Sequence, residues 1–546
     1  MKSKTHLLNP VSLVLMFTFA IPLQAQAIDY YVNQNHPSAN DQNAGTIDQP
    51  WKTISKANQA LTPGDTAYIN AGTYSSYIAP VNSGTSSARI TYRNYATDTV
   101  TIANTGYGIH LNGKSYVTVQ GINFSNVDQF LLLQNGANRN IIAYCNFDQG
   151  RTIGWSGSQI YRNSSYNWIH HSRFSKYGYF TNDDIGSILD IGTEASTTDN
   201  SNYNVIEDST FYHGGHHVLG VFSNFNVLRN NFMHNENWYN YGGTRYGNRV
   251  LYVLGYRNYT MLNVIEGNRI GYAGIPSDGD SSYNLQLSAS YNIVRYNEFY
   301  KGTATGIILS MTSNYPDSPS YNRIYNNTFW ANGIAGVGGE KECGIGLADW
   351  EDTGNITGNV FKNNLFYQNG SPATSFAYYY VSPGNQIIAN NWEETGDPQF
   401  TNISGTDPMS STSPDFTLQS NSPVINVGRN LTTVSTIIDT DTIVVADAYY
   451  FQPGTWAAPE VGLMADEICI GTLSNCVKIS SITYSTNRID TASAHGAQVG
   501  DAVWLYKDSG GKLVLVGSGP DIGAHEYGIH DNQTPSAPGN LRVRSP

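Results

Sequence analysis

The chain has 546 residues, of which 40% are hydrophobic and 13% charged, and its formal net charge is −13 at pH 7. So small a charged fraction argues against long amphipathic helices, whose outer faces are usually rich in Glu and Lys. The acidic balance argues against a nucleic-acid partner, because binding nucleic acid requires a basic stripe that replaces counterions.

The first 27 residues have the pattern of a bacterial-type signal peptide. Lys2 and Lys4 precede an apolar run at 11–22, and Ala25-Gln26-Ala27 fits a small-residue cleavage site. The run is too short for a transmembrane helix, and no other stretch is long and apolar enough to span a bilayer. We therefore expect residues 1–27 to be removed and the mature protein to be secreted, extracellular or periplasmic, without a membrane span.

An internal repeat runs through the central part of the chain. Each repeat has an Asn, an apolar pair, a short polar stretch and a final aromatic or aliphatic residue, which is the mark of that repeat. The repeats begin at Asn140, Asn167, Asn204, Asn226, Asn263, Asn292, Asn322, Asn359 and Asn385. Their marks are Phe147, Phe174, Phe211, Phe232, Ile270, Phe299, Phe329, Phe366 and Trp392. The marks lie about 21 to 38 residues apart, which is a period typical of solenoid proteins.

A second set of apolar segments precedes the marked ones, at 108–111, 130–133, 188–191, 218–221, 250–253, 284–287, 306–309 and 344–347. Because coils of two or three short strands cannot bury their own apolar residues, they stack at about 4.8 Å and share one core. Asn suits the sharp bends, since it tolerates left-handed backbone geometry, and stacked Asn side chains can hydrogen-bond along the stack. The repeat therefore predicts an all-β fold, a parallel β-helix in which these Asn residues are structural.

Three intervals between marks are longer than the others: 174–211, 232–270 and 329–366. Insertions in a solenoid map to loops on one face, which is often the binding face. The sequence therefore predicts the functional face at these three coils.

Segments near both ends resemble those of secreted right-handed parallel β-helix proteins of the pectate-lyase-like superfamily. The first coils contain Pro63-Gly64-Asp65-Thr66 and resemble those of family-nine polysaccharide lyases; the closing coils contain Pro520-Asp521-Ile522-Gly523. This resemblance implies a right-handed β-helix over 28–430 with a closing segment at 519–530. It does not specify the chemistry, since this superfamily includes several activities.

Two further regions interrupt or follow the β-helix. Residues 431–518 alternate apolar and polar side chains, which predicts a small β-barrel-like insert, either a stabilising cap or a glycan-contacting module. Residues 531–546 resemble the first strand of a fibronectin type III domain or a linker. Cys469 and Cys476 flank a short turn and favour a disulfide, whereas Cys145 and Cys343 are expected to be buried apolar fillers.

The first long coil carries carboxylates that fit two chemistries. If Leu189 and Ile191 point inward, Asp190 points outward. Asp183 and Asp184 resemble the calcium-binding Asp cluster of family-nine lyases and the Asp pair of polygalacturonase-type hydrolases, although the Gly spacing and Arg-Ile-Lys segment of those families are missing. The candidate Ca²⁺ ligands are Asp183, Asp184 and Asp190; the candidate acid and base of an inverting hydrolase are Asp184, Asp190 and Glu194.

The coils that follow carry histidines, aromatic residues and arginines. His213, His216 and His217 could supply a base, a substrate clamp or metal ligands, or form a surface turn. Candidate sugar-binding residues are Trp238, Tyr241, Arg245, Arg249, Lys341 and Trp350, through aromatic stacking and carboxylate pairing. Lys341 lies between two glutamates, which stabilise its ammonium form and disfavour it as a general base.

The sequence favours a secreted enzyme that degrades an extracellular polysaccharide, with calcium-assisted β-elimination of a uronate-containing polymer as the leading hypothesis. Hydrolysis by paired carboxylates is the second hypothesis. A non-catalytic surface or adhesion β-helix that binds glycans is the third. We expect a monomer, because nothing in the sequence indicates an oligomer.

Overall fold

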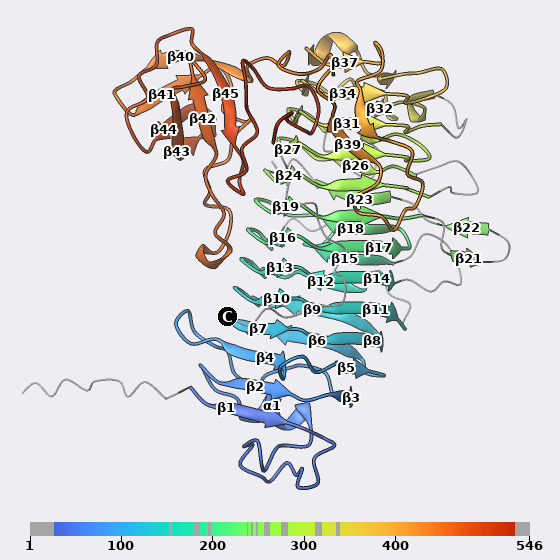
Figure 1. The fold of residues 1–546 in the computed structure, drawn as a ribbon, viewed down its shortest axis with the longest axis vertical. Helices are drawn as coiled ribbons and strands as arrows, with labels where there is room; N and C mark the ends of the chain where they lie inside the picture. The colour runs from blue at the N-terminus through green and yellow to red at the C-terminus, as the bar shows by residue number, and fades with distance from the viewer. Residues whose placement is uncertain are drawn as a thin grey trace, which may run out of the picture.

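The chain forms a parallel β-helix with a small barrel beside its C-terminal coils, as the sequence predicts (Figure 1). The computed structural model describes residues 27–151, 156–177, 186–194, 198–236, 239–241, 244–246, 249–255, 262–274, 282–311, 319–334 and 339–529. Residues 1–26 of the predicted signal peptide, the tail from 530 onward, Asp183, Asp184 and Trp238 lie outside these residues. No helix in the described ranges is long and apolar enough to cross a membrane.

Within the described residues, sheet A has 13 parallel strands. They are β1 (Asp29–Val32), β2 (Thr66–Ile69), β4 (Ile90–Asn94), β7 (Val117–Gln120), β10 (Ile141–Ala143), β13 (Trp168–His170), β16 (Val205–Glu207), β19 (Val227–Arg229), β24 (Val264–Glu266), β27 (Ile293–Arg295), β30 (Arg323–Tyr325), β33 (Val360–Lys362) and β36 (Ile387–Ala389).

Sheet B has 12 parallel strands in the same part of the chain. They are β3 (Gly72–Tyr74), β5 (Val100–Ala103), β8 (Asn123–Val127), β11 (Asn146–Gly150), β14 (Arg173–Tyr177), β17 (Thr210–Gly214), β20 (Phe232–His234), β25 (Arg269–Gly271), β28 (Glu298–Tyr300), β31 (Thr328–Trp330), β34 (Leu365–Tyr367) and β37 (Trp392–Glu393).

Sheet C has 10 parallel strands among the described residues and contains the predicted second set of segments. They are β6 (Tyr107–Asn112), β9 (Gln129–Gln134), β12 (Ser158–Ile160), β15 (Ser187–Ile191), β18 (His217–Val221), β23 (Arg249–Leu254), β26 (Leu285–Ser288), β29 (Ile307–Met311), β32 (Ile345–Asp349) and β35 (Phe376–Tyr379).

The core between the three sheets is a stack of aligned side chains. Phe124, Phe147, Phe174 and Phe211 stack with ring centroids 4.6, 4.3 and 4.9 Å apart, close to the spacing of stacked coils. Two of the predicted marks are wrong by one residue. Met233 and Glu393 occupy the ladder position predicted for Phe232 and Trp392, because the strand pairing aligns Phe211 with Met233 and Phe366 with Glu393.

Asn side chains form the predicted hydrogen-bond ladder along the axis. The series begins at Asn140. From Asn167 to Asn359, each amide oxygen accepts the backbone N–H of the preceding member, and Gln386 rather than Asn385 ends the series. These Asn residues do not themselves adopt the left-handed backbone. The residue before each one often does, including Tyr166, Tyr203, Phe225 and Tyr291. Stacking of Tyr166, Tyr203 and Phe225, with centroids 4.8 and 5.1 Å apart, compensates for the strained geometry.

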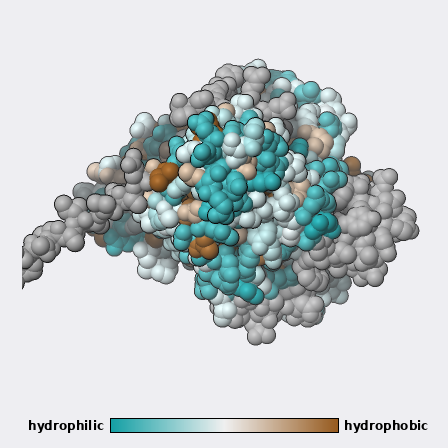
Figure 2. Space-filling model, turned by 90° about the horizontal axis from the view of Figure 1, so that it is seen from below, coloured by the Kyte–Doolittle hydropathy of each residue, from teal (hydrophilic) through white to brown (hydrophobic). Residues whose placement is uncertain are grey.

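The first coil is closed by α1 (Ile54–Ala60). Thr53 is its N-cap, and its side chain accepts the N–H of Lys56. Trp51, Ile54, Ala57 and Leu61 are buried there and cover the core. Seen from this end, the surface is largely hydrophilic with small separate hydrophobic areas (Figure 2).

The insert is a closed antiparallel barrel that packs on the outer side of sheet A. Its strands are β40 (Thr432–Ile437), β41 (Thr442–Val445), β42 (Glu467–Ile470), β43 (Cys476–Thr483), β44 (Arg488–Thr491) and β45 (Ala502–Lys507). Val227, Val264 and Ile293 of sheet A share a core with the barrel. Beside it, the fully buried Arg295 binds Asp466 through two contacts of 2.7 and 2.8 Å. The predicted Cys469–Cys476 disulfide is present, and Cys145 and Cys343 are buried.

The remaining elements lie outside the three long sheets. They are the strand pairs β21 (Tyr239–Tyr241) with β22 (Thr244–Tyr246) and β38 (Phe400–Asn402) with β39 (Asp415–Leu418), and the short 3-10 helices η1 (Gly339–Lys341), η2 (Pro383–Asn385), η3 (Pro459–Val461) and η4 (Tyr484–Thr486). β38, β39 and the closing segment near Ile522 pack on the outer side of sheet B through Phe400, Phe416 and Ile522.

Candidate functional site

Three predicted residues, Asp190, His216 and His217, meet on the outer side of sheet C. Leu189 and Ile191 point into the core, so Asp190 points outward as predicted. Oδ1 of Asp190 lies 2.7 Å from Nε2 of His217. Its Oδ2 accepts hydrogen bonds from Ser187, at 2.6 Å, and from Ser156. Both Asp190 and His217 are buried, so the pair is shielded from solvent.

The hydrogen bonds continue from His217 through His216 to Arg249. Nδ1 of His217 lies 2.8 Å from Nδ1 of His216, and Nε2 of His216 lies 2.6 Å from Nη1 of Arg249. A guanidinium group only donates, so Nε2 of His216 accepts and its proton lies on Nδ1. His217 then accepts at Nδ1 and donates from Nε2 to Asp190. Every proton in the chain is therefore directed toward the Asp190 carboxylate.

His216 is held in its neutral form by its surroundings. Burial, the Arg249 cation and the neighbouring His217 together lower the pKa of His216 well below its usual value. A neutral imidazole beside an arginine can accept a proton from a substrate, provided that the arginine moves to another partner. The arrangement thus has the parts of a general base and an anion-binding group.

Side chains of the next coils extend this polar chain along the axis. Strand register places Asp190, Gly220, Tyr252 and Gln286 at one outward position on successive strands. Arg249 lies over the Tyr252 ring at 5.1 Å and donates its Nε–H to Gln286, whose own amide donates to Ser310 at 2.9 Å. Five consecutive coils, from β15 to β29, therefore contribute polar groups to one face.

His213 belongs to a second cluster at the start of the His216–His217 turn. Its Nε2 lies 2.6 Å from Glu236, which also binds His234. Although burial opposes its ionisation, the hydrogen bonds from His213 and His234 hold the pKa of Glu236 well below its usual range. The adjacent Asn235 accepts the N–H of Gly214 at 3.0 Å and donates to the carbonyl of Arg249 at 3.3 Å. This cluster positions the turn and is not part of the series of hydrogen bonds from Arg249 to Asp190.

The other predicted residues belong to other parts of the chain than the histidines or lie outside the described residues. Glu194 follows β15, and Tyr241 and Arg245 belong to the β21–β22 pair, in which Tyr241 lies opposite Thr244. Trp350 follows β32 and packs on Ile308 and Ala348 of sheet C. Lys341 ends η1, beside β32, which is four strands along sheet C from β18.

Of the three predicted calcium ligands, only Asp190 lies in the described part of the chain. Both of its carboxylate oxygens already accept hydrogen bonds from side chains. The described ranges contain no group of three or more His, Cys, Asp or Glu residues that could hold a metal ion. Since Asp183 and Asp184 lie outside the described residues, the predicted calcium site stays a prediction.

The chain is similar to known proteins over different lengths. Residues 30–187 match the family described as "Pel9A-like, right handed beta helix region". A segment of 94 residues is 29% identical to the uncharacterized protein YwoF of Bacillus subtilis (strain 168); it covers 16% of this chain and 20% of YwoF. The chain therefore spans about a fifth of that curated relative.

The chain is also similar to solved structures at low identity. The pectate lyase Pel9A is 15% identical with a TM-score of 0.49, covering 76% of this chain and 94% of its own. A rhamnogalacturonan lyase is 16% identical with a TM-score of 0.45, covering 69% of this chain and 91% of its own. The GH136 lacto-N-biosidase of Eubacterium ramulus is 12% identical with a TM-score of 0.45, covering 67% of each chain. These values support no conclusion about activity.

The sequence interpretation missed several residues of the face. Ser156 and Ser187 bind Asp190, Gly220 leaves room beside it, and Gln286 continues the chain. Gln286 could have been found, because it occupies in 284–287 the outward position that Asp190 occupies in 188–191. The two serines precede their apolar segments and carry no such signal.

Proposed function

We propose that this protein is a secreted polysaccharide lyase that cleaves a uronate-containing polymer by β-elimination on the outer face of sheet C. The observation that carries the proposal is the directed chain of hydrogen bonds from Arg249 through His216 and His217 to Asp190. The match of residues 30–187 to a family named for Pel9A, a pectate lyase, supports the same class of enzyme.

In the proposed reaction, Arg249 pairs with the uronate carboxylate through two parallel hydrogen bonds and releases Nε2 of His216. His216 then removes the proton from the carbon next to the carboxylate. The electron pair of that C–H bond forms a C=C bond, and the bond to the glycosidic oxygen breaks with its electrons. Solvent water protonates the departing oxygen. Asp190, acting through His217, stabilises the imidazolium that forms on His216.

The calcium requirement remains a prediction. A bound cation would neutralise the uronate carboxylate and acidify the neighbouring proton. Asp183 and Asp184 are the residues that could hold it, and the reaction described above includes no step through the ion.

The test is an assay of acidic and neutral polysaccharides, with added calcium and with a chelator. We expect an acidic polymer to yield new reducing ends together with the ultraviolet absorbance of an unsaturated product. His216→Ala should lower kcat about 10²- to 10⁴-fold, the usual contribution of a general base. His36→Ala, which changes a histidine in the first coil, serves as the control.

Two results would contradict the proposal. Reducing ends without absorbance would indicate hydrolysis, and binding of the polymers without cleavage would indicate a non-catalytic β-helix. Equal loss of activity in His216→Ala and His36→Ala would exclude His216 as the base while leaving the lyase assignment intact.

A further inference from the structure

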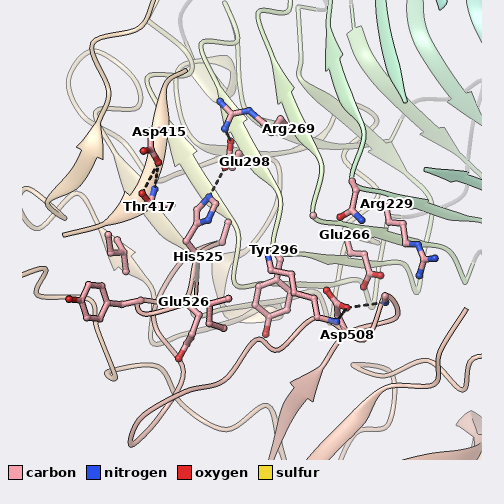
Figure 3. A pocket seen from close by; sticks show the side chains of 18 of the residues that line it. Arg229, Glu266, Arg269, Tyr296, Glu298, Asp415, Thr417, Asp508, His525 and Glu526 are labelled. Carbon is pink, nitrogen blue, oxygen red and sulfur yellow. Dashed lines mark hydrogen bonds and ion pairs between the residues drawn. The ribbon is translucent and has the colours of Figure 1, made fainter. Parts of the chain in front are cut away.

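A pocket of about 940 Å³ lies between the β-helix and the C-terminal segments, away from sheet C. One wall is formed where sheets A and B meet, by residues such as Glu207, Arg229 and Glu298. The other wall comes from three segments that follow the β-helix: β38–β39, the turn at 508–512 of the barrel, and 524–529 (Figure 3). Only the folded chain brings these parts together.

Fixed ion pairs line the β-helix wall. Glu207 binds Nε of Arg229 at 2.5 Å, and Glu298 contacts Arg269 and His525, each at 2.6 Å (Figure 3). Arg269 is 6% exposed, yet its Nε–H has no hydrogen-bond acceptor in the described chain. A buried donor without an acceptor is costly, which indicates that a ligand or water supplies one.

The lining carries an excess of negative charge, with seven Asp or Glu residues and three Arg or Lys residues. Carboxylates accept hydrogen bonds from hydroxyl groups, whereas a second carboxylate would be repelled. Burial and the nearby Glu266 raise the pKa of Asp508 to about 7, and burial and Asp521 raise the pKa of Glu526 to about 8. Near neutral pH the pocket can therefore both accept and donate hydrogen bonds.

We propose that this pocket binds an oligosaccharide that carries no acidic groups, as a second glycan site independent of the proposed lyase activity. Its volume falls in the range of ligand pockets, about 300–1,000 Å³. Tyr527 is 41% exposed in the lining and offers an aromatic face for a sugar ring. The pocket is thus suited to neutral glycans and the sheet C site around Asp190 to acidic ones, on different faces of the β-helix.

The test is calorimetric titration of the full chain with cellohexaose, xylohexaose, mannohexaose and hexagalacturonate. We expect at least one neutral hexasaccharide to bind, and its affinity to fall about tenfold in Tyr527→Ala, as loss of a stacking contact would cause. Asp508→Asn should also weaken binding, although its remaining oxygen can still accept the N–H groups of Gly510 and Lys512.

Two variants serve as controls. Tyr380→Ala removes an exposed tyrosine elsewhere on the β-helix, and His216→Ala alters the sheet C face. Neither should change the affinity for the neutral hexasaccharide. The proposal is wrong if no neutral hexasaccharide binds, if Tyr527→Ala and Asp508→Asn both bind as tightly as the parent, or if hexagalacturonate displaces the neutral ligand.

Discussion

Gly220 lies between Asp190 and Tyr252 on the outer side of sheet C, where a larger residue would block the hydrogen bond from His217. A Cβ atom at this position would lie 2.4 Å from Oδ1 of Asp190 and 2.6 Å from Nε2 of His217. Real Cβ atoms do not approach other atoms so closely, so one of the two side chains would have to move. Gly220 has no side chain that could take part in a reaction, but its small size permits the hydrogen bond between His217 and Asp190.

Gly220→Ala should therefore separate His217 from Asp190 while the coil stays folded. We expect loss of the downfield proton signal of the His217 Nε2–H in NMR spectra. The kcat of the proposed lyase reaction should fall at least about tenfold, since the imidazolium on His216 would lose the stabilisation that Asp190 gives through His217. Gly106→Ala is the matched control, because its nearest neighbour, Oδ2 of Asp128, is 3.9 Å away. An unchanged His217 signal in Gly220→Ala would contradict this account.

At the scale of the elements, Asn ladders hold neighbouring coils in register. Asn297 donates to the carbonyls of Ile265 and Arg295 and accepts the backbone and side-chain N–H groups of Asn268, all in the buried interior. The sequence repeat predicted such a ladder. It did not show that the left-handed backbone belongs to the residue before most members of the Asn140 series, because spacing alone does not specify dihedral angles.

Asn297→Ala should lower the free energy of unfolding by at least about 3 kcal/mol, because several buried backbone groups lose their partners at about 1–3 kcal/mol each. Thermal or urea unfolding followed by circular dichroism measures the change. Asn112→Ala is the control, since Asn112 is exposed and accepts one hydrogen bond from Asn135. If both variants lost a similar amount of unfolding free energy, the buried Asn ladder would stabilise the protein no more than an exposed hydrogen bond does.

At the scale of the whole molecule, the closing segment is attached through buried carboxyl groups. Glu526 accepts the N–H groups of Val516 and Asp521 at 2.8 and 2.9 Å. Its pKa is raised from 4.5 to about 8, first by burial and then by Asp521. The folded protein therefore binds this proton more tightly than the unfolded chain. The contribution of Glu526 to the free energy of unfolding is therefore complete below about pH 4.5 and is lost as the pH rises to about 8.

Glu526→Gln, which mimics the protonated side chain, should weaken this pH dependence. We expect the parent to be the more stable protein near pH 5, because Gln has one acceptor fewer, and this advantage to shrink or reverse by pH 8.5. The difference in melting temperature between parent and variant, measured across this range, tests the expectation. A difference that does not change with pH would contradict the assignment.

The sequence by itself determined the repeating parts of the molecule. Alternation in short strands placed Asp190 outward, the Asn and aromatic periods predicted the β-helix, and the spacing of Cys469 and Cys476 predicted their disulfide. These are local properties, which depend only on the period of the strand and the chemistry of each turn. The predicted marks at Phe232 and Trp392 failed by one residue because a period does not fix the register between coils of unequal length.

Only the tertiary structure decided which outward side chains meet. Asp190, His217 and Arg249 come from successive coils, and their contacts depend on the register of β15, β18 and β23. Contacts such as Arg295 with Asp466, and the pocket beside His525, join segments more than 100 residues apart. Such contacts arise when separate apolar surfaces pack together, and no local pattern in the sequence records that packing.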